Sequence, residues 1–253
     1  MGADQNFDWD QAAASTLEWW RDAGVDVAID EAPRNWLLRA APTAAADPAV
    51  TTADAVAAPD MVPDTLAAFA VWRIGPDAPE AAWHGKAIAA QGDAASDIMI
   101  VIDMPEREDG ETGILLSGAP GRLFDRMLAA IGHSRDSVYL VPLCAARPAA
   151  ARIAPEIEVR LGEILMHHVA LAQPKRVLLM GNAPSRALLG MDFLRARGGL
   201  RSLNHSAPNH LADAANSDYE AVATFHPRFL IEQPAKKADA WKDLQMLIGG
   251  LQS

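Results

Sequence analysis

The stretch IMIVI, residues 98–102, is a short run of apolar residues with no polar interruption. A run of this kind is typical of a strand that is buried on both faces of a sheet. Similar runs follow at residues 138–143, 176–180 and 221–225, and segments with helical spacing occupy residues 122–131, 156–172, 184–189 and 236–247. Strands that alternate with helices predict an α/β fold: a three-layer α/β/α sandwich around a central, mainly parallel four-stranded sheet.

The chain has 253 residues, of which half are apolar, so it is long enough to bury a sizeable core. Residues 8–23 have helical spacing and end at Gly24, whereas residues 42–63 are Ala, Thr, Asp and Pro with few large apolar side chains. We therefore expect a helical extension over residues 1–40, an Ala/Pro/Asp-rich linker over residues 41–64 and a folded domain over residues 65–253.

Charge and cysteine content exclude several classes of protein. The net charge of −11 argues against a general nucleic-acid binder, although residues 1–113 carry −15 and residues 114–253 carry +4. The single cysteine, Cys144, excludes a disulfide framework and a zinc or iron–sulfur site ligated by cysteines of this chain alone. No apolar run reaches the roughly 18 residues of a membrane span, so we expect a cytoplasmic protein without a membrane partner.

Four residues stand at or just past the ends of the predicted strands: Asp103, Pro142, which should end the strand that begins at residue 138, Asn182 and His226. In a parallel sheet, functional groups lie on the loops at the carboxyl ends of the strands. We therefore expect these four side chains to line one crevice.

Four segments occur in order with near-unbroken spacing: VIDMPEREDGETGILLSGAPGRLFDRMLAAIG (101–132), VYLVPLCAARPAAAR (138–152), KRVLLMGNAPSRALLG (175–190) and TFHPRFLIEQPAKKADAWKDL (224–244). Over about residues 95–247 they resemble the family-4 uracil-DNA glycosylases, of the type carried by alphaproteobacteria. The last segment is the most specific, because it is similar to the family pattern TYHPAYLLRQPxxKxxAWxDL. The resemblance implies a uracil-DNA glycosylase fold over residues 65–253 and a place in DNA base-excision repair.

The resemblance also implies roles for particular residues. His226, which keeps the histidine of the HP motif, is expected to stabilise the departing uracil anion as a preorganised donor. Asp103, at the family's glutamate, is expected to act on the oxocarbenium-like sugar or on an oriented water. The base pocket is expected to contain Met104, Pro105, Leu116, Pro142 and Asn182.

The sequence departs from the family pattern inside that pocket. The family's GEAPG motif reads IDMPE at residues 102–106, so Glu106 stands at the position of the motif's last glycine. The stacking phenylalanine falls at Leu116 and the asparagine that reads uracil falls at Pro142. Because these positions lack the ring and the amide that would bind uracil, we expect glycosylase activity to be reduced or lost.

The resemblance places cluster-ligating cysteines of the family at Ala146 and near Leu161, while Cys144 lies two positions from the first of them. No cysteine pair precedes them in the sequence. We predict that the family's iron–sulfur cluster is absent, with no other cofactor and no metal site in its place.

Residues 195–210 are the most basic stretch, and we expect Arg195, Arg197 and Arg201 to contact DNA weakly and with strong salt dependence, unless this stretch is only a solvated surface loop.

Three interpretations of the function stay open. The chain is a divergent glycosylase, a non-catalytic descendant that binds DNA, a nucleotide or a protein, or an enzyme acting on a free nucleoside or nucleotide. The sequence identifies no protein partner for the N-terminal extension.

Overall fold

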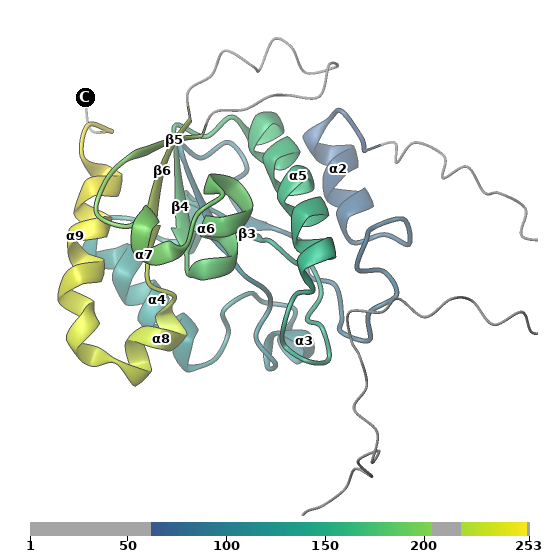
Figure 1. The fold of residues 1–253 in the computed structure, drawn as a ribbon, viewed down its shortest axis with the longest axis horizontal. Coiled ribbons are helices and arrows are strands. Elements are labelled where there is room, and N and C mark those ends of the chain that lie inside the picture. The colour runs from purple at the N-terminus through teal and green to yellow at the C-terminus, as the bar shows by residue number, and fades with distance from the viewer. Residues whose placement is uncertain (1–61, 204–218, 252–253) are drawn as a thin grey trace, which may run out of the picture. The chain divides into compact units, whose positions relative to one another are not determined.

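The computed structural model describes residues 62–203 and 219–251, and Figure 1 shows its fold. The predicted helical extension, residues 1–40, and residues 41–61 of the predicted linker lie outside the described residues. The described part contains one mixed sheet of six strands in the order β1-β3-β2-β4-β6-β5. Its strands are β1 (Gln91–Gly92), β2 (Ile98–Ile102), β3 (Tyr139–Pro142), β4 (Arg176–Met180), β5 (Arg201–Leu203) and β6 (Tyr219–Thr224).

The four predicted strands form the centre of this sheet. β3, β2, β4 and β6 are parallel to one another, which confirms the parallel core. The prediction of a four-stranded sheet is wrong, because β1 pairs antiparallel with β3 and β5 pairs antiparallel with β6. These edge strands have only two and three residues, QG and RSL, and neither contains the apolar run by which a strand is recognised in sequence.

Eight α-helices lie within the described residues: α2 (Leu66–Arg73), α3 (Asp109–Thr112), α4 (Ala119–Ala130), α5 (Pro155–Ala172), α6 (Asn182–Leu189), α7 (Phe193–Ala196), α8 (Pro227–Glu232) and α9 (Lys237–Ile248). Two short 3-10 helices, Arg135–Ser137 and Pro234–Lys236, complete the elements of this part. None of the helices in residues 62–203 and 219–251 combines the length and the apolar composition that crossing a bilayer requires.

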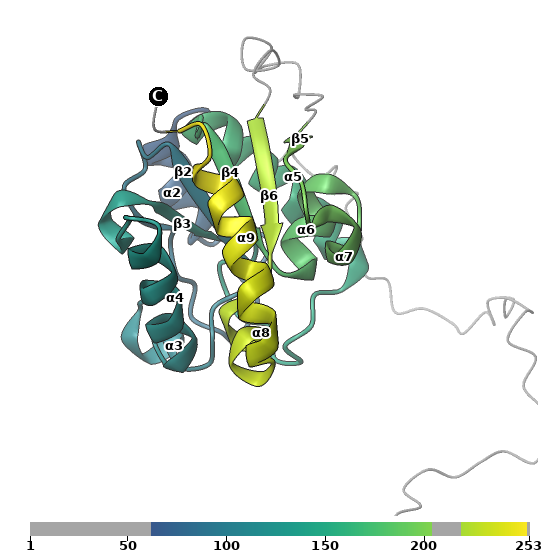
Figure 2. The same ribbon diagram turned by 90° about the vertical axis from the view of Figure 1, so that its left-hand side faces the viewer.

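The helices cover both faces of the sheet, as the side-chain alternation of β2 requires. Ile98 and Ile100 belong to the hydrophobic cluster that contains Phe124 of α4 and Leu244 of α9. Met99 belongs to a second cluster, on the opposite face, with side chains of α5. Figures 1 and 2 show the resulting layers, with α4 and α9 on one side of the sheet and α5 on the other. The predicted three-layer sandwich is therefore the observed arrangement of the described residues.

Arg176 fastens the amino end of β4 to the end of α9. Its side chain is buried, and its Nη1 donates to the backbone oxygens of Met246 and Leu247 at 2.7 and 2.8 Å. Its Nη2 lies 2.9 Å from a carboxylate oxygen of Glu220 on β6. Arg176 thus satisfies carbonyls in the last turn of α9 that have no partner within the helix.

We predict that Arg176→Met lowers the free energy of unfolding by about 2–4 kcal/mol, because it leaves one buried and one partly buried carbonyl without donors. The neighbouring Lys175 pairs with Asp97 at the exposed surface. Lys175→Met is therefore the matched control, with an expected loss below about 1 kcal/mol. Urea unfolding of both variants measures the difference, and equal losses would contradict this role of Arg176.

Candidate active site

Asp103 and His226 meet at the carboxyl edge of the sheet, as the sequence predicts. Asp103 directly follows β2 and His226 lies two residues beyond β6, and these two strands flank β4. The Nε2 atom of His226 lies 3.7 Å from Oδ1 of Asp103. The imidazole is buried, whereas about a fifth of the Asp103 side chain is exposed. The two groups thus face each other at the boundary between the core and solvent.

The hydrogen bonds of His226 define its protonation. His226 caps the amino end of α8, and its Nδ1 accepts a hydrogen bond from the backbone N–H of Arg228 at 3.2 Å. Burial lowers the pKa of His226 to about 4, although the nearby Asp103 carboxylate acts in the opposite direction. The ring is therefore neutral at pH 7, with its proton on Nε2. That Nε2 atom has no hydrogen-bond partner among the described residues.

Arg228 joins the two loops at this edge. Its Nη2 donates to Oδ2 of Asp103 at 2.9 Å, and its Nη1 donates to both carboxylate oxygens of Glu106 at 2.8 and 3.0 Å. We call Asp103, Glu106 and Arg228 the clasp. Burial raises the pKa of Glu106 in spite of its pairing with Arg228. A guanidinium bound to two carboxylates is held in a fixed orientation, so Arg228 links the loop after β2 to the start of α8.

The sequence analysis named Glu106 only as a departure from the family pattern and did not name Arg228, which joins it to Asp103. The family pattern has glycine at position 106 and alanine at position 228, and this chain has one acidic and one basic residue there. The sequence therefore contained one signal for their pairing: residues of opposite charge stand at two positions where the family pattern has small residues.

Asp109 organises the loop between β2 and α4. Its carboxylate is fully buried and accepts hydrogen bonds from the backbone N–H groups of Glu106, Leu116 and Ser117 and from the Ser117 hydroxyl. Leu116 has a φ of 52°, a left-handed conformation that few L-residues adopt. The guanidinium of Arg135 also donates to its carbonyl, so these contacts hold Leu116 in that conformation.

The predicted base-pocket residues mostly serve packing. Leu116 is fully buried in the cluster with α4, and Met104 is buried in the cluster with α5. Pro105 is buried and its carbonyl accepts from Arg147, while Pro142 is the buried last residue of β3. Asn182 opens α6, and its Oδ1 accepts from the backbone N–H of Phe193 in α7.

Of the four residues predicted to line one crevice, the structure brings Asp103 and His226 within 3.7 Å of each other, and the shared crevice stays a prediction. Pro142 lies within β3, paired in register with Ile102, and not beyond the end of the strand. The amide oxygen of Asn182 is occupied by α7. The roles given to the predicted pocket residues stay predictions.

The three arginines predicted to contact DNA differ in their surroundings. Arg197 forms two hydrogen bonds with the buried carboxylate of Asp243, and its guanidinium lies 4.5 Å from the ring centre of Phe225. Arg195 and Arg201 are exposed, and Arg201 donates only to the carbonyls of Arg195 and Ala196 among the described residues. The structure thus uses Arg197 to fasten α9, and two cations remain at the surface.

The residues at the predicted cluster positions do not fit a cysteine-ligated cluster. Ala146 and Leu161 are buried and offer no ligand atom. Cys144 is buried as well, and burial raises the pKa of its thiol, which disfavours the thiolate that binds iron. Within residues 62–203 and 219–251, no group of three or more His, Cys, Asp or Glu side chains is placed to hold a metal ion.

Comparison with known proteins agrees with this fold. Residues 89–245 match the family model of the Uracil DNA glycosylase superfamily, so the chain belongs to that superfamily. The Type-4 uracil-DNA glycosylase of Pyrobaculum aerophilum is 26% identical over 170 residues, which cover 66% of this chain and 85% of that protein. The Type-4 uracil-DNA glycosylase of Archaeoglobus fulgidus is 22% identical over 163 residues, 62% of this chain and 77% of its own length. Within the superfamily the chain is a family-4-like member, which confirms the resemblance found in the sequence.

We predict that His226 makes the stability depend on pH. The pKa of His226 is about 4 in the folded protein and 6.5 in the unfolded chain. Between these two pH values the unfolded chain therefore binds a proton at His226 and the folded protein does not. Its contribution is complete above pH 6.5, falls as the pH drops toward 4 and amounts to on the order of 3 kcal/mol. His226→Asn retains a helix-capping side chain without this titration, so its unfolding free energy should fall less over that range.

His84→Asn, a change at an exposed histidine, is the control and should behave like the unchanged protein. Chemical unfolding at pH 7.5, 5.5 and 4.5 measures the three profiles. If the His226→Asn profile coincides with that of the unchanged protein, a buried neutral His226 is excluded.

Proposed function

We propose that this chain is a DNA base N-glycosylase with low activity toward uracil. The observation that carries the proposal is the buried, neutral His226, whose Nε2–H lacks a partner and lies 3.7 Å from the Asp103 carboxylate. A buried donor without a partner costs about 1–3 kcal/mol, so it is uncommon unless a function uses it. A base oxygen that becomes negative on bond cleavage is the acceptor that such a donor would serve.

The proposed reaction uses the two side chains in different ways. The N-glycosidic bond breaks and its electron pair leaves with the base, whose anion accepts a hydrogen bond from Nε2–H of His226. The positive charge that develops on the sugar is stabilised by the carboxylate of Asp103. A water molecule then forms the new bond to C1′ and gives its proton to Asp103.

Recognition of the base is the weak part of the proposed site. Leu116 and Pro142 stand where the resemblance places a stacking ring and a reading amide, and Pro142 has no N–H and no side-chain amide. Each of those contacts is worth on the order of 1–3 kcal/mol. Losing both weakens transition-state binding by about 30-fold to 20,000-fold, since each 1.36 kcal/mol is a factor of ten. Poor selectivity for uracil follows.

The clasp adds a second restriction. Arg228 occupies the carboxylate that the reaction requires, and its bonds to Asp103 and Glu106 must open before a sugar can approach. We infer that the closed clasp represents the protein without DNA. The names of the two relatives, both uracil-DNA glycosylases, support DNA as the partner and base excision repair as the setting.

A non-catalytic, DNA-binding descendant is the second candidate. The complete burial of Leu116 favours it, because the side chain at the expected stacking position is part of the core and does not face a pocket.

We predict that the full chain releases uracil slowly from single-stranded DNA and that Arg228→Ala increases the rate about tenfold or more, because it frees Asp103. His226→Ala should lower any measured rate about 100-fold, the range of a lost oxyanion donor. Alkali cleavage of end-labelled, uracil-containing DNA measures all three rates. Arg186→Ala, which removes an exposed arginine paired with Glu158, is the matched control and should leave the rate unchanged.

Each outcome decides a different point. A rate that is unchanged in His226→Ala contradicts the proposed chemistry, and a lower rate in Arg228→Ala means that Arg228 acts in catalysis. If the unchanged chain and Arg228→Ala both bind DNA but release no uracil, the proposed uracil release is wrong and the non-catalytic candidate is favoured.

We also predict that DNA binding is weak and falls steeply with salt between about 50 and 200 mM, with Arg195 and Arg201 as contributors. Arg195→Ala or Arg201→Ala should reduce the salt slope by about one. Arg126→Ala, on the exposed face of α4, is the control. Fluorescence anisotropy with labelled single-stranded DNA provides the slopes, and a slope that neither substitution changes would show that these arginines do not contact phosphate.

A further inference from the structure

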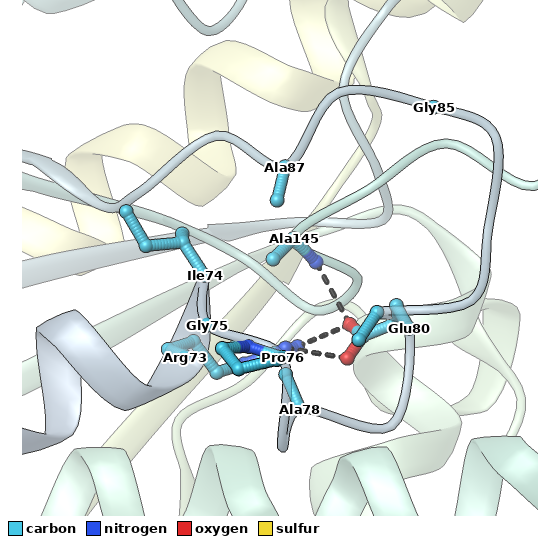
Figure 3. A pocket seen from close by; sticks show the side chains of 10 residues that line it. Arg73, Ile74, Gly75, Pro76, Ala78, Glu80, Gly85, Ala87 and Ala145 are labelled. Atoms are coloured by element: carbon cyan, nitrogen blue, oxygen red, sulfur yellow. Dashed lines mark hydrogen bonds and ion pairs between the residues drawn. The ribbon is translucent and has the colours of Figure 1, made fainter.

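Arg73 and Glu80 form a buried ion pair at the end of α2. The guanidinium donates from Nη1 to Oε2 of Glu80 at 2.6 Å and from Nη2 to Oε1 at 2.5 Å. Only 9% and 2% of the two side chains are exposed. Figure 3 shows the two side chains facing each other with both bonds drawn. We call these two residues the buried pair.

The buried pair is also bound to the backbone that follows β3. Nη2 of Arg73 donates to the carbonyl of Leu143 at 2.8 Å, and the N–H of Ala145 donates to Oε1 of Glu80 at 2.9 Å. Two side chains therefore connect the end of α2, the segment after it and the loop after β3. Because both charges are paired and hydrogen-bonded, the pair avoids the large penalty of an isolated buried charge.

The segment after α2 lies directly against the loop that follows β3. The N–H of Ile88 donates to the carbonyl of Ala145 at 2.8 Å. A Cβ on Gly85 would lie 2.5 Å from the carbonyl oxygen of Arg147, so only glycine permits this approach. A cavity of about 210 Å³ remains beside the pair, lined largely by small residues that include Gly75, Ala78 and Ala145.

This contact also reaches the candidate active site. The N–H of Cys144 donates to the carbonyl of Asp103 at 3.0 Å, and Arg147 donates to the carbonyl of Pro105 at 2.9 Å. The loop after β3 therefore supports the loop that carries Asp103. The buried pair in turn holds the loop after β3 in place.

We propose that the buried pair of Arg73 and Glu80 is the internal crosslink of this corner of the fold, and that it replaces an iron–sulfur cluster in that role. The Glu80-bound Ala145 directly precedes Ala146, a position where the resemblance places a cluster ligand and where this chain has no ligand atom. The chain then folds and keeps the Asp103 loop in place without iron. The proposal does not depend on base release.

Thermal unfolding of the full chain tests the crosslink. Removing one partner of a buried, hydrogen-bonded ion pair leaves the other charge uncompensated, so Arg73→Ala and Glu80→Ala should each lower the midpoint by about 10 °C. Glu80→Gln keeps an acceptor for the Ala145 N–H and should lower it by less. In Arg73→Met/Glu80→Leu no charge is left unpaired, so the double variant should unfold at a higher temperature than either alanine variant.

Arg186→Ala, which breaks the more exposed Arg186–Glu158 pair, is the matched control and should shift the midpoint by less than about 4 °C. If either alanine variant does not fold, Glu80→Gln and the double variant still provide the comparison. Single-variant midpoints equal to that of the control would overturn the crosslink.

Metal analysis tests the replacement. Iron and acid-labile sulfide in the full chain, purified without oxygen, should be far below one equivalent, and the visible spectrum should lack cluster absorption. A stoichiometric cluster would overturn the proposal even if the thermal data agreed with it.

Discussion

The carboxylate of Asp103 is the point at which the loop after β2 meets the residues that follow β6. One oxygen faces the Nε2–H of His226 and the other binds Arg228, so a residue from the end of β2 contacts two residues from the end of β6. This meeting requires β4 to lie between β2 and β6 with all three strands parallel, and it requires Asp109 to hold the loop after β2. The chemistry of the site therefore depends on the order of the sheet.

The clasp places charged side chains where the family pattern has small residues. The family pattern has small residues at positions 106 and 228, and this chain has an acid and an arginine that bind each other there. Because Arg228 is paired with Glu106 and Asp103, these charges cost little free energy while the clasp is intact. A substrate must compete with Arg228 for the carboxylate of Asp103. The retained imidazole and the ion pairs of Arg228 are expected to have opposite effects on activity, and this is the reason that we propose a slow enzyme.

The parallel core of the fold was predictable from sequence because its four strands are mostly apolar and almost entirely buried. β1 was not, since its two residues pair through a geometry that sequence does not display: Gly92 has a φ of 92°, and a Cβ there would lie 2.0 Å from the carbonyl oxygen of Val138. The contact of Asp103 with His226 followed from strand topology alone. The clasp and the buried pair did not, because they join charges whose positions depend on loop conformation, and Arg228 lies 122 residues from Glu106.

The most direct test of this account is the protonation of the His226 ring, observed by nitrogen-15 NMR with His226→Asn to assign the signals. The account predicts a neutral ring at pH 7, with a proton on Nε2, a bare Nδ1 and no titration until the pH approaches 4. A ring that titrates near its ordinary pKa, or that carries its proton on Nδ1, would contradict the account, because Nε2 would then not be a buried donor prepared for a departing base.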